Sequence, residues 1–230
     1  MQMELSAALR TTGSVRSFTD EPVDDATVHR VLDTARFAPS GGNAQGWHVI
    51  VVKSPEIRTQ IRDLAQFTWN EYAQLTAMGI RPYGADETGR WPGPPPGVDL
   101  TLLRAKHIPN PMLDHLVEAP VVLVVCADLR AIAAMDIELD RTQTTGGASI
   151  YPFAWSILLA AHGEGLGGVM TTFLVRQEPL AKPILQLPPH MAIASMIVLG
   201  HPVHRNTKLT RKPVEAFTTV DTFAGVTFAP

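Results

Sequence analysis

Residues 38–47 read Ala-Pro-Ser-Gly-Gly-Asn-Ala-Gln-Gly-Trp and lie between a segment with helical periodicity and an apolar, strand-like segment. Their glycines let the backbone approach a neighbouring group closely. The carboxamides Asn43 and Gln45 can both donate and accept hydrogen bonds. A flat heterocycle with polar edges would need both properties. A glycine-rich connection between a helix and a strand has the same composition, so this decapeptide leaves two interpretations open.

The flanking sequence predicts alternating helices and strands. A helix should begin at Asp24-Asp25, carry apolar residues at helical spacing from Val28 to Ala35, and end before Pro39. Because strands are few and helices dominate, we expect an α+β or mixed α/β arrangement rather than a long doubly wound sheet. The further predicted helices are 3–10, 55–78, 149–162 and 178–186, and the predicted strands are 48–53, 121–127, 169–174 and 191–200.

Residues 79–111 have a different character. Nine prolines and glycines between Pro82 and Gly97 exclude a continuous helix or a central strand. A long irregular segment within a domain is commonly a lid or a linker. The aromatic residues in and just before the segment favour a lid that packs against the protein. We therefore predict one domain over 1–230 with a lid at about 67–111.

The amino-acid composition argues against a nucleic-acid-binding, membrane or secreted protein. The 230 residues are 45% hydrophobic and 18% charged, and the net charge of −3 gives no basic surface for nucleic acid. No apolar run approaches the roughly 20 residues of a membrane helix, and the amino terminus lacks the pattern of a secretion signal. The single cysteine, Cys126, lies in an apolar strand and is expected to be buried. We expect a cytoplasmic protein with no membrane or nucleic-acid partner.

Four common catalytic or binding patterns can be set aside. Gly163-Glu-Gly-Leu-Gly-Gly168 has the spacing of a dinucleotide-binding loop, but a predicted helix precedes it and a strand follows, which is the reverse of the required order. His201 and His204 have no accompanying carboxylate or cysteine cluster, so we predict no metal site. The sequence contains neither a nucleophile elbow nor a P-loop lysine motif.

Arg16 and Arg211 lie beside short polar loops. Guanidinium groups bind phosphate bidentately, and Thr12 and Ser14 add hydroxyl groups near Arg16. Taken singly, each arginine is more consistent with a solvated surface charge. Together they could form a phosphate pocket.

Four segments in order resemble the landmarks of the FMN-dependent nitroreductase superfamily. They are Val15-Arg-Ser-Phe-Thr-Asp-Glu-Pro-Val23, the decapeptide 38–47, Gly165-Leu-Gly-Gly168 and Arg211-Lys-Pro213. The resemblance implies an α+β fold with a central mixed or antiparallel sheet flanked by helices, and an intertwined homodimer with FMN at two interface sites.

The same resemblance implies where the cofactor lies. Ser14 and Arg16 would hold its phosphate and ribityl chain together with Arg211, and the segment from Pro39 to Asn43 would lie against the ring, with Ser40 reaching across the dimer. Thr12 and Gly13 stand where arginine or histidine is more usual, and Arg10 could substitute. The full set of implied cofactor-binding residues is Ser14, Arg16, Pro39, Ser40, Gly41, Asn43, Gln45, Thr171, Thr172 and Arg211.

The implied activity is ping-pong hydride transfer from NAD(P)H through flavin N5 to a nitroaromatic, quinone or activated alkene. The flavin carries the chemistry, so no catalytic side chain is expected, although Thr171 and Thr172 could tune the ring. Alternatives remain open: a flavin-binding storage or sensor protein, a flavin-fragmenting enzyme, or a reductive dehalogenase of iodotyrosines. That last branch uses a glutamate and a tyrosine one helical turn apart, whereas Glu71 has Leu75 at this spacing. A protein without flavin, in which the aromatic segment docks a partner, is a further alternative.

Overall fold

The computed structural model describes residues 4–206 and 208–230, and within these ranges it contains one four-stranded sheet. Met3, where the first predicted helix begins, lies outside the described residues. The sheet order is β1-β2-β4-β3, formed by β1 (Trp47–Val51), β2 (Val121–Asp128), β4 (Met191–Gly200) and β3 (Gly167–Thr171). Each neighbouring pair is antiparallel, so the sheet that the resemblance left as mixed or antiparallel is antiparallel.

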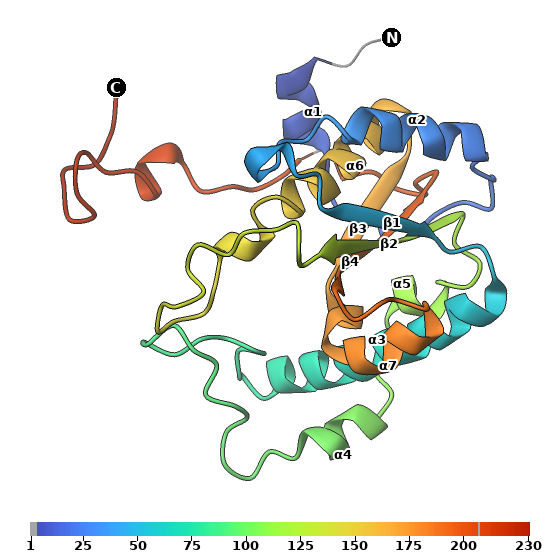
Figure 1. The fold of residues 1–230 in the computed structure, drawn as a ribbon, viewed down its shortest axis with the longest axis horizontal. Helices are drawn as coiled ribbons and strands as arrows, with labels where there is room; N and C mark the ends of the chain where they lie inside the picture. Colours follow the sequence, from blue (N-terminus) through green and yellow to red (C-terminus); the bar gives the residue numbers. More distant parts are fainter. Residues whose placement is uncertain (1–3, 207) are drawn as a thin grey trace.

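Helices cover both faces of this sheet (Figure 1). On one face lie α2 (Asp25–Ala35) and α6 (Tyr151–Gly163), with α1 (Leu5–Thr11) beside them. On the other lie α3 (Pro55–Ala77), α5 (Pro111–Asp114) and α7 (Glu178–Ile184). The predicted α+β class is confirmed. None of the helices in the described part of the chain combines the length and the apolar character needed to cross a membrane.

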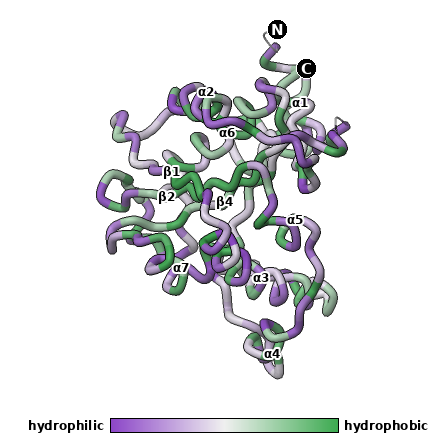
Figure 2. The backbone as a smooth tube through the Cα atoms, turned by 90° about the vertical axis from the view of Figure 1, so that its right-hand side faces the viewer, coloured by the Kyte–Doolittle hydropathy of each residue, from purple (hydrophilic) through white to green (hydrophobic). Residues whose placement is uncertain are grey.

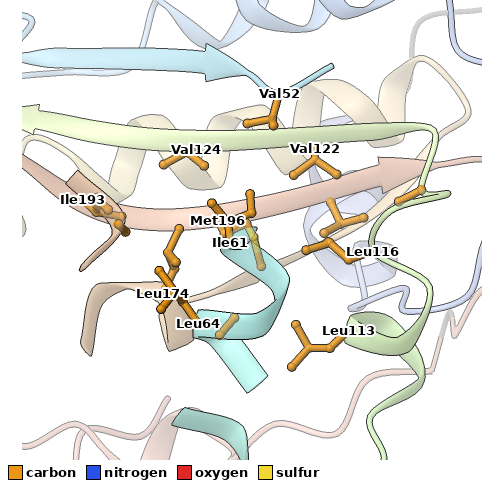
Figure 3. Packing of buried hydrophobic residues seen from close by; sticks show 14 of the residues in the cluster. Val52, Ile61, Leu64, Leu113, Leu116, Val122, Val124, Leu174, Ile193 and Met196 are labelled. Carbon is orange, nitrogen blue, oxygen red and sulfur yellow. The ribbon is translucent and has the colours of Figure 1, made fainter. Parts of the chain in front are cut away.

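Strand β2 is the centre of the core because its side chains alternate between the two faces. Val122, Val124 and Cys126 pack with α3 and α5, while the intervening residues pack with α2 and α6. Figure 3 shows Val122 and Val124 on the side of the sheet that faces α3. The strands form the most hydrophobic part of the backbone in Figure 2. A period of two with apolar residues on both faces is what a strand buried on both sides requires.

Most element boundaries differ from the predictions by one or two residues, one strand ends three residues early, and two short helices were not predicted. The strand expected at 169–174 begins at Gly167 and ends at Thr171, because the next residues tighten into the 3₁₀ turn η3 (Phe173–Gln177). Helices α4 (Leu100–Ala105) and α5 were not predicted. Helix α4 begins inside the proline- and glycine-rich segment, where the Asp99 carboxylate caps it by accepting a hydrogen bond from the Thr101 amide at 2.8 Å.

Helix α3 continues without interruption to Ala77. The irregular insertion therefore comprises residues 78–99, and the aromatic residues 67, 69 and 72 belong to the helix that precedes it. These three residues therefore lie on a regular helix rather than in the irregular insertion.

Candidate functional site

The segment after α1 runs along the free edge of β3 and places Arg16 between two cavities. Ser14 forms an isolated parallel bridge with Gly168, and the Val15 amide donates to the Gly168 carbonyl at 2.9 Å. Arg16 follows directly and lines the cavities on both sides of this contact. The backbone pairing thus fixes the position of the arginine relative to the strand.

The first cavity has a volume of about 290 Å³ and is rich in groups that bind phosphate. Ser14, Arg16 and Arg211 line it, so the structure brings together the three residues expected at a phosphate. Within residues 4–206 and 208–230, neither arginine is paired with a carboxylate. Two guanidinium groups and one hydroxyl group are suited to a phosphate dianion. The remaining lining residues are Thr12, Gly13, Trp155, Leu158, Gly168, Asn206 and Leu209.

The second cavity, of about 550 Å³, lies at the end of β3 and includes Thr171 and Thr172. Its wall is aromatic: Trp69 and Tyr72 of α3 stack with ring centroids 6.0 Å apart, and Phe173 lies 5.6 Å from Trp69. Such a wall offers a flat apolar surface to a planar molecule. The first cavity offers hydrogen-bond donors suited to a phosphate, and the second offers an aromatic wall suited to a planar ring. Together they fit a flavin mononucleotide.

The decapeptide lines neither of these two cavities. Residues 41–45 are exposed at the surface and are held by local hydrogen bonds. The Ser40 hydroxyl accepts from the Gln45 amide at 2.9 Å, and the Ser149 hydroxyl accepts from the Gly41 amide at 3.0 Å. Asn43 and Gln45 adopt positive φ angles of 54° and 50°, which are strained for residues other than glycine. Pro39, Ser40, Gly41, Asn43 and Gln45 therefore form a rigid exposed loop.

Gly13 has a packing role that explains the departure from the usual arginine or histidine. A Cβ atom at this position would lie 2.7 Å from the Asn206 carbonyl oxygen. The two walls of the phosphate cavity thus touch where the side chain would be. Arg10, the expected substitute, lines an adjoining groove of about 910 Å³ with Lys208 and Lys212.

A buried ion cluster fixes the insertion beside the aromatic cavity. The Glu71 carboxylate is fully buried and accepts hydrogen bonds from the Tyr83 hydroxyl, from Arg104, and from Arg176 Nε at 2.6 Å. The Arg176 guanidinium also lies over the rings of Tyr83 and Trp91, 4.5 and 5.3 Å from their centroids. Because Arg176 belongs to η3, the insertion is tied to the segment that carries Phe173.

The hydrogen bonds and charges in this cluster shift the pKa values of Glu71 and Tyr83. Burial by itself would raise the pKa of Glu71, but the hydrogen bonds from Tyr83, Arg176 and Arg104 outweigh it and hold that pKa below its ordinary value. Burial, reinforced by the Glu71 carboxylate, raises the pKa of the Tyr83 hydroxyl. Glu71 is therefore a carboxylate and Tyr83 a neutral donor at neutral pH.

Several lining residues were not identified from the sequence. Trp69 and Tyr72 were among the aromatic residues that favoured a lid, but they were not predicted to line a site. Their spacing of three residues on one helix indicates that they share a face. Asn110 and Phe173 carried no local signal, because they reach the cavity through the packing of α5 and η3 against α3.

Known proteins resemble this chain over most of its length. It is 27% identical to an FMN reductase [NAD(P)H] of Bacillus subtilis, covering 96% of this chain and 74% of the relative. It is 29% identical to human iodotyrosine deiodinase 1, covering 88% of this chain and 63% of the relative. A solved iodotyrosine deiodinase bound to FMN and 3-iodo-L-tyrosine superposes with a TM-score of 0.63 at 21% identity, covering 96% of this chain and all of that structure.

The family model described as Nitroreductase family matches residues 9–201, which include the Arg16 segment, the decapeptide and the end of β3. On that match, together with the antiparallel sheet and the two cavities at its edge, the chain belongs to the nitroreductase family.

Proposed function

We propose that this protein is an FMN-dependent NAD(P)H oxidoreductase that reduces a nitroaromatic, a quinone or an activated alkene. The observation that carries the proposal is the position of Arg16, which lines a phosphate-type cavity on one side and a flat aromatic cavity on the other. A molecule with a phosphate at one end and a planar ring at the other would fit along this arginine. The B. subtilis relative, named as an FMN reductase, supports the same cofactor.

Each residue has a separate role in this proposal. Ser14, Arg16 and Arg211 would bind the phosphate, while Thr171 and Thr172 would donate hydrogen bonds at the ring edge and stabilise negative charge there. When bound, FMN supplies the capacity to accept and pass on a hydride. The aromatic wall of the second cavity would exclude water and hold donor and acceptor in turn, as a ping-pong sequence requires.

We infer that the functional unit is a homodimer in which the decapeptide completes the site of the other protomer. The loop is rigid, exposed and strained, yet it lines neither cavity of its own chain. The carboxyl-terminal segment also runs away from the body of the fold (Figure 1), and its Phe217, Phe223 and Phe228 are more than half exposed. An exposed apolar segment of this kind favours burial against a second copy.

Deiodination of an iodotyrosine is less well supported by the geometry. A carboxylate is a common partner of an amino-acid ammonium group, but the Glu71 carboxylate is already engaged by three donors and does not line the cavity. The lining of the aromatic cavity includes no other carboxylate. We therefore favour an acceptor without a zwitterionic group.

Absorbance spectroscopy tests the proposal. The purified protein incubated with FMN should retain the flavin bands, lose them on anaerobic addition of NADPH or NADH, and regain them when a quinone or nitroaromatic is added. A protein that stays colourless with FMN would contradict the proposal. Bound flavin that NAD(P)H does not bleach would indicate storage or sensing, and bands that do not return after reoxidation would indicate flavin fragmentation.

A further inference from the structure

His162 is a buried polar residue one helical turn beyond Leu158, which lines the phosphate cavity. It lies in the last turn of α6 and is only 6% exposed. Its Nε2 atom is 2.8 Å from the Thr11 hydroxyl oxygen, and its Nδ1 atom contacts the Arg205 guanidinium. Because both ring nitrogens of this buried histidine contact a partner, the side chain connects the segment of Thr11 to the segment of Arg205.

The hydrogen-bond network assigns the state of this imidazole. The Thr11 hydroxyl donates to the Ala7 carbonyl at 2.7 Å, so it accepts from Nε2–H of His162. Arg205 has only donors, so Nδ1 must accept. The imidazole is therefore neutral, with its proton on Nε2.

The two partners precede two of the segments that line the phosphate cavity. Thr11 is followed by Thr12, Gly13, Ser14 and Arg16, and Arg205 is followed by Asn206, Leu209 and Arg211. Arg205 also donates to the carbonyl oxygens of Gly165 at 2.9 Å and Leu166 at 3.1 Å, which precede a third lining segment at Gly168. Gly168 is held in β3, but residues 12–14, 206 and 209 lie outside the helices and the four strands. There the histidine and the arginine supply contacts that regular secondary structure does not.

We propose that His162 is a positioning residue for the cofactor phosphate. The inference rests on the proposed function and extends it. The neutral imidazole holds the Thr11 and Arg205 segments at the separation at which Ser14, Arg16 and Arg211 converge on one cavity. Without it, each segment must be ordered when the phosphate binds, which weakens affinity.

The test compares two flavins that differ only in the phosphate. Apo-protein is titrated with FMN and with riboflavin, and the dissociation constants are taken from the quenching of flavin fluorescence. In His162→Leu we expect Kd for FMN to rise about tenfold, since two hydrogen bonds are lost, one of them to a charged group. Kd for riboflavin should change less than about twofold on this argument, because the aromatic cavity is untouched.

Two conservative variants and one control complete the design. His162→Asn retains an acceptor near Nδ1 for Arg205, and His162→Gln retains a donor near Nε2 for Thr11; each should raise Kd for FMN less than His162→Leu. If the leucine variant does not fold, the ratio of the two flavin affinities in these variants decides the question. Val28→Ala removes buried volume from α2, which packs against α6 away from the cavity, and should leave the ratio unchanged.

The outcomes separate this inference from the proposed function. Wild-type affinity for FMN in all three His162 variants, or equal losses for FMN and riboflavin, would overturn the positioning role while leaving the flavin proposal intact. A wild-type protein that binds neither flavin would overturn the proposed function itself.

Discussion

Replacing Glu71 by glutamine tests how firmly the insertion is fastened to α3. The substitution keeps the shape of the side chain and one oxygen acceptor but removes the negative charge that faces two arginines. Arg176 is 24% exposed and Arg104 is 38% exposed, whereas Glu71 is fully buried. Arg104 can turn towards water, so most of the loss comes from Arg176 and the Tyr83 hydroxyl.

The magnitude follows from these exposures. Breaking a fully buried ion pair costs about 3–5 kcal/mol, and the partly exposed Arg104 adds no more than about 1 kcal/mol. We expect a loss of about 3 kcal/mol, which lowers the melting temperature of a chain of this length by about 6–12 °C if unfolding is cooperative.

Thermal unfolding followed by circular dichroism measures the loss in stability. Trypsin cleavage after Arg90, which precedes Trp91, shows whether the insertion opens locally. Asp63→Asn is the matched control, because Asp63 lies on the same helix in an exposed pair with Arg62; it should change stability by less than about 0.5 kcal/mol. Equal melting temperatures and equal cleavage rates in Glu71→Gln and Asp63→Asn would refute the reasoning.

The pH dependence provides a second check on Glu71. Its pKa in the folded state is lowered from the ordinary 4.5, so its contribution to stability is complete above that value and is lost as the pH falls through the folded pKa. The difference in melting temperature between wild type and Glu71→Gln should therefore be largest at neutral pH and shrink below about pH 4. A difference that stays constant down to pH 3 would contradict the assigned charge.

Three further predictions concern single residues. Replacing Arg16 or Arg211 by alanine should raise Kd for FMN by about ten- to a hundredfold, because each loses a charge-assisted contact with phosphate; fluorescence titration measures it, and unchanged affinity would remove that residue from the site. Gly168→Ala should lower the free energy of unfolding by about 1–3 kcal/mol in urea titrations, because a Cβ there would lie 2.4 Å from a methyl group of Leu199. Burial raises the pKa of Cys126 to about 11, so iodoacetamide at pH 8 should label it only after unfolding, and rapid labelling of the native protein would show that the thiol is accessible.

Local patterns in the sequence were sufficient for most of the fold. The apolar run of β2 predicts a strand, and the helical spacing from Val28 to Ala35 predicts a helix. In both cases the local sequence is sufficient to determine the conformation. The Asp24 carboxylate does cap its helix, accepting from the Thr27 amide at 2.7 Å. Gly165, with a φ of 82°, does lie in a turn between α6 and β3, while Gly167 and Gly168 begin the strand. This helix–turn–strand order is the one that argued against a dinucleotide-binding loop.

The candidate site depends on contacts that local patterns do not contain. Trp69, Asn110 and Phe173 meet because three separate elements pack together, and no spacing in the sequence records that arrangement. The same holds for Glu71, which reads as an ordinary helical glutamate until Tyr83, 12 residues later, and Arg176, 105 residues later, bury it.

The family landmarks, all helices and strands but α4, α5 and the shortest turns, and the residue types able to bind a phosphate were predictable from the amino-acid sequence. These features follow from chemistry and periodicity within short segments. Only the tertiary structure decided which of these residues share a cavity. Pairing of Ser14 with Gly168 places Arg16 in the lining of both cavities, while the exposed decapeptide 38–47 lines neither of them. Convergence of distant residues is fixed by sheet pairing and packing, and these are properties of the whole chain.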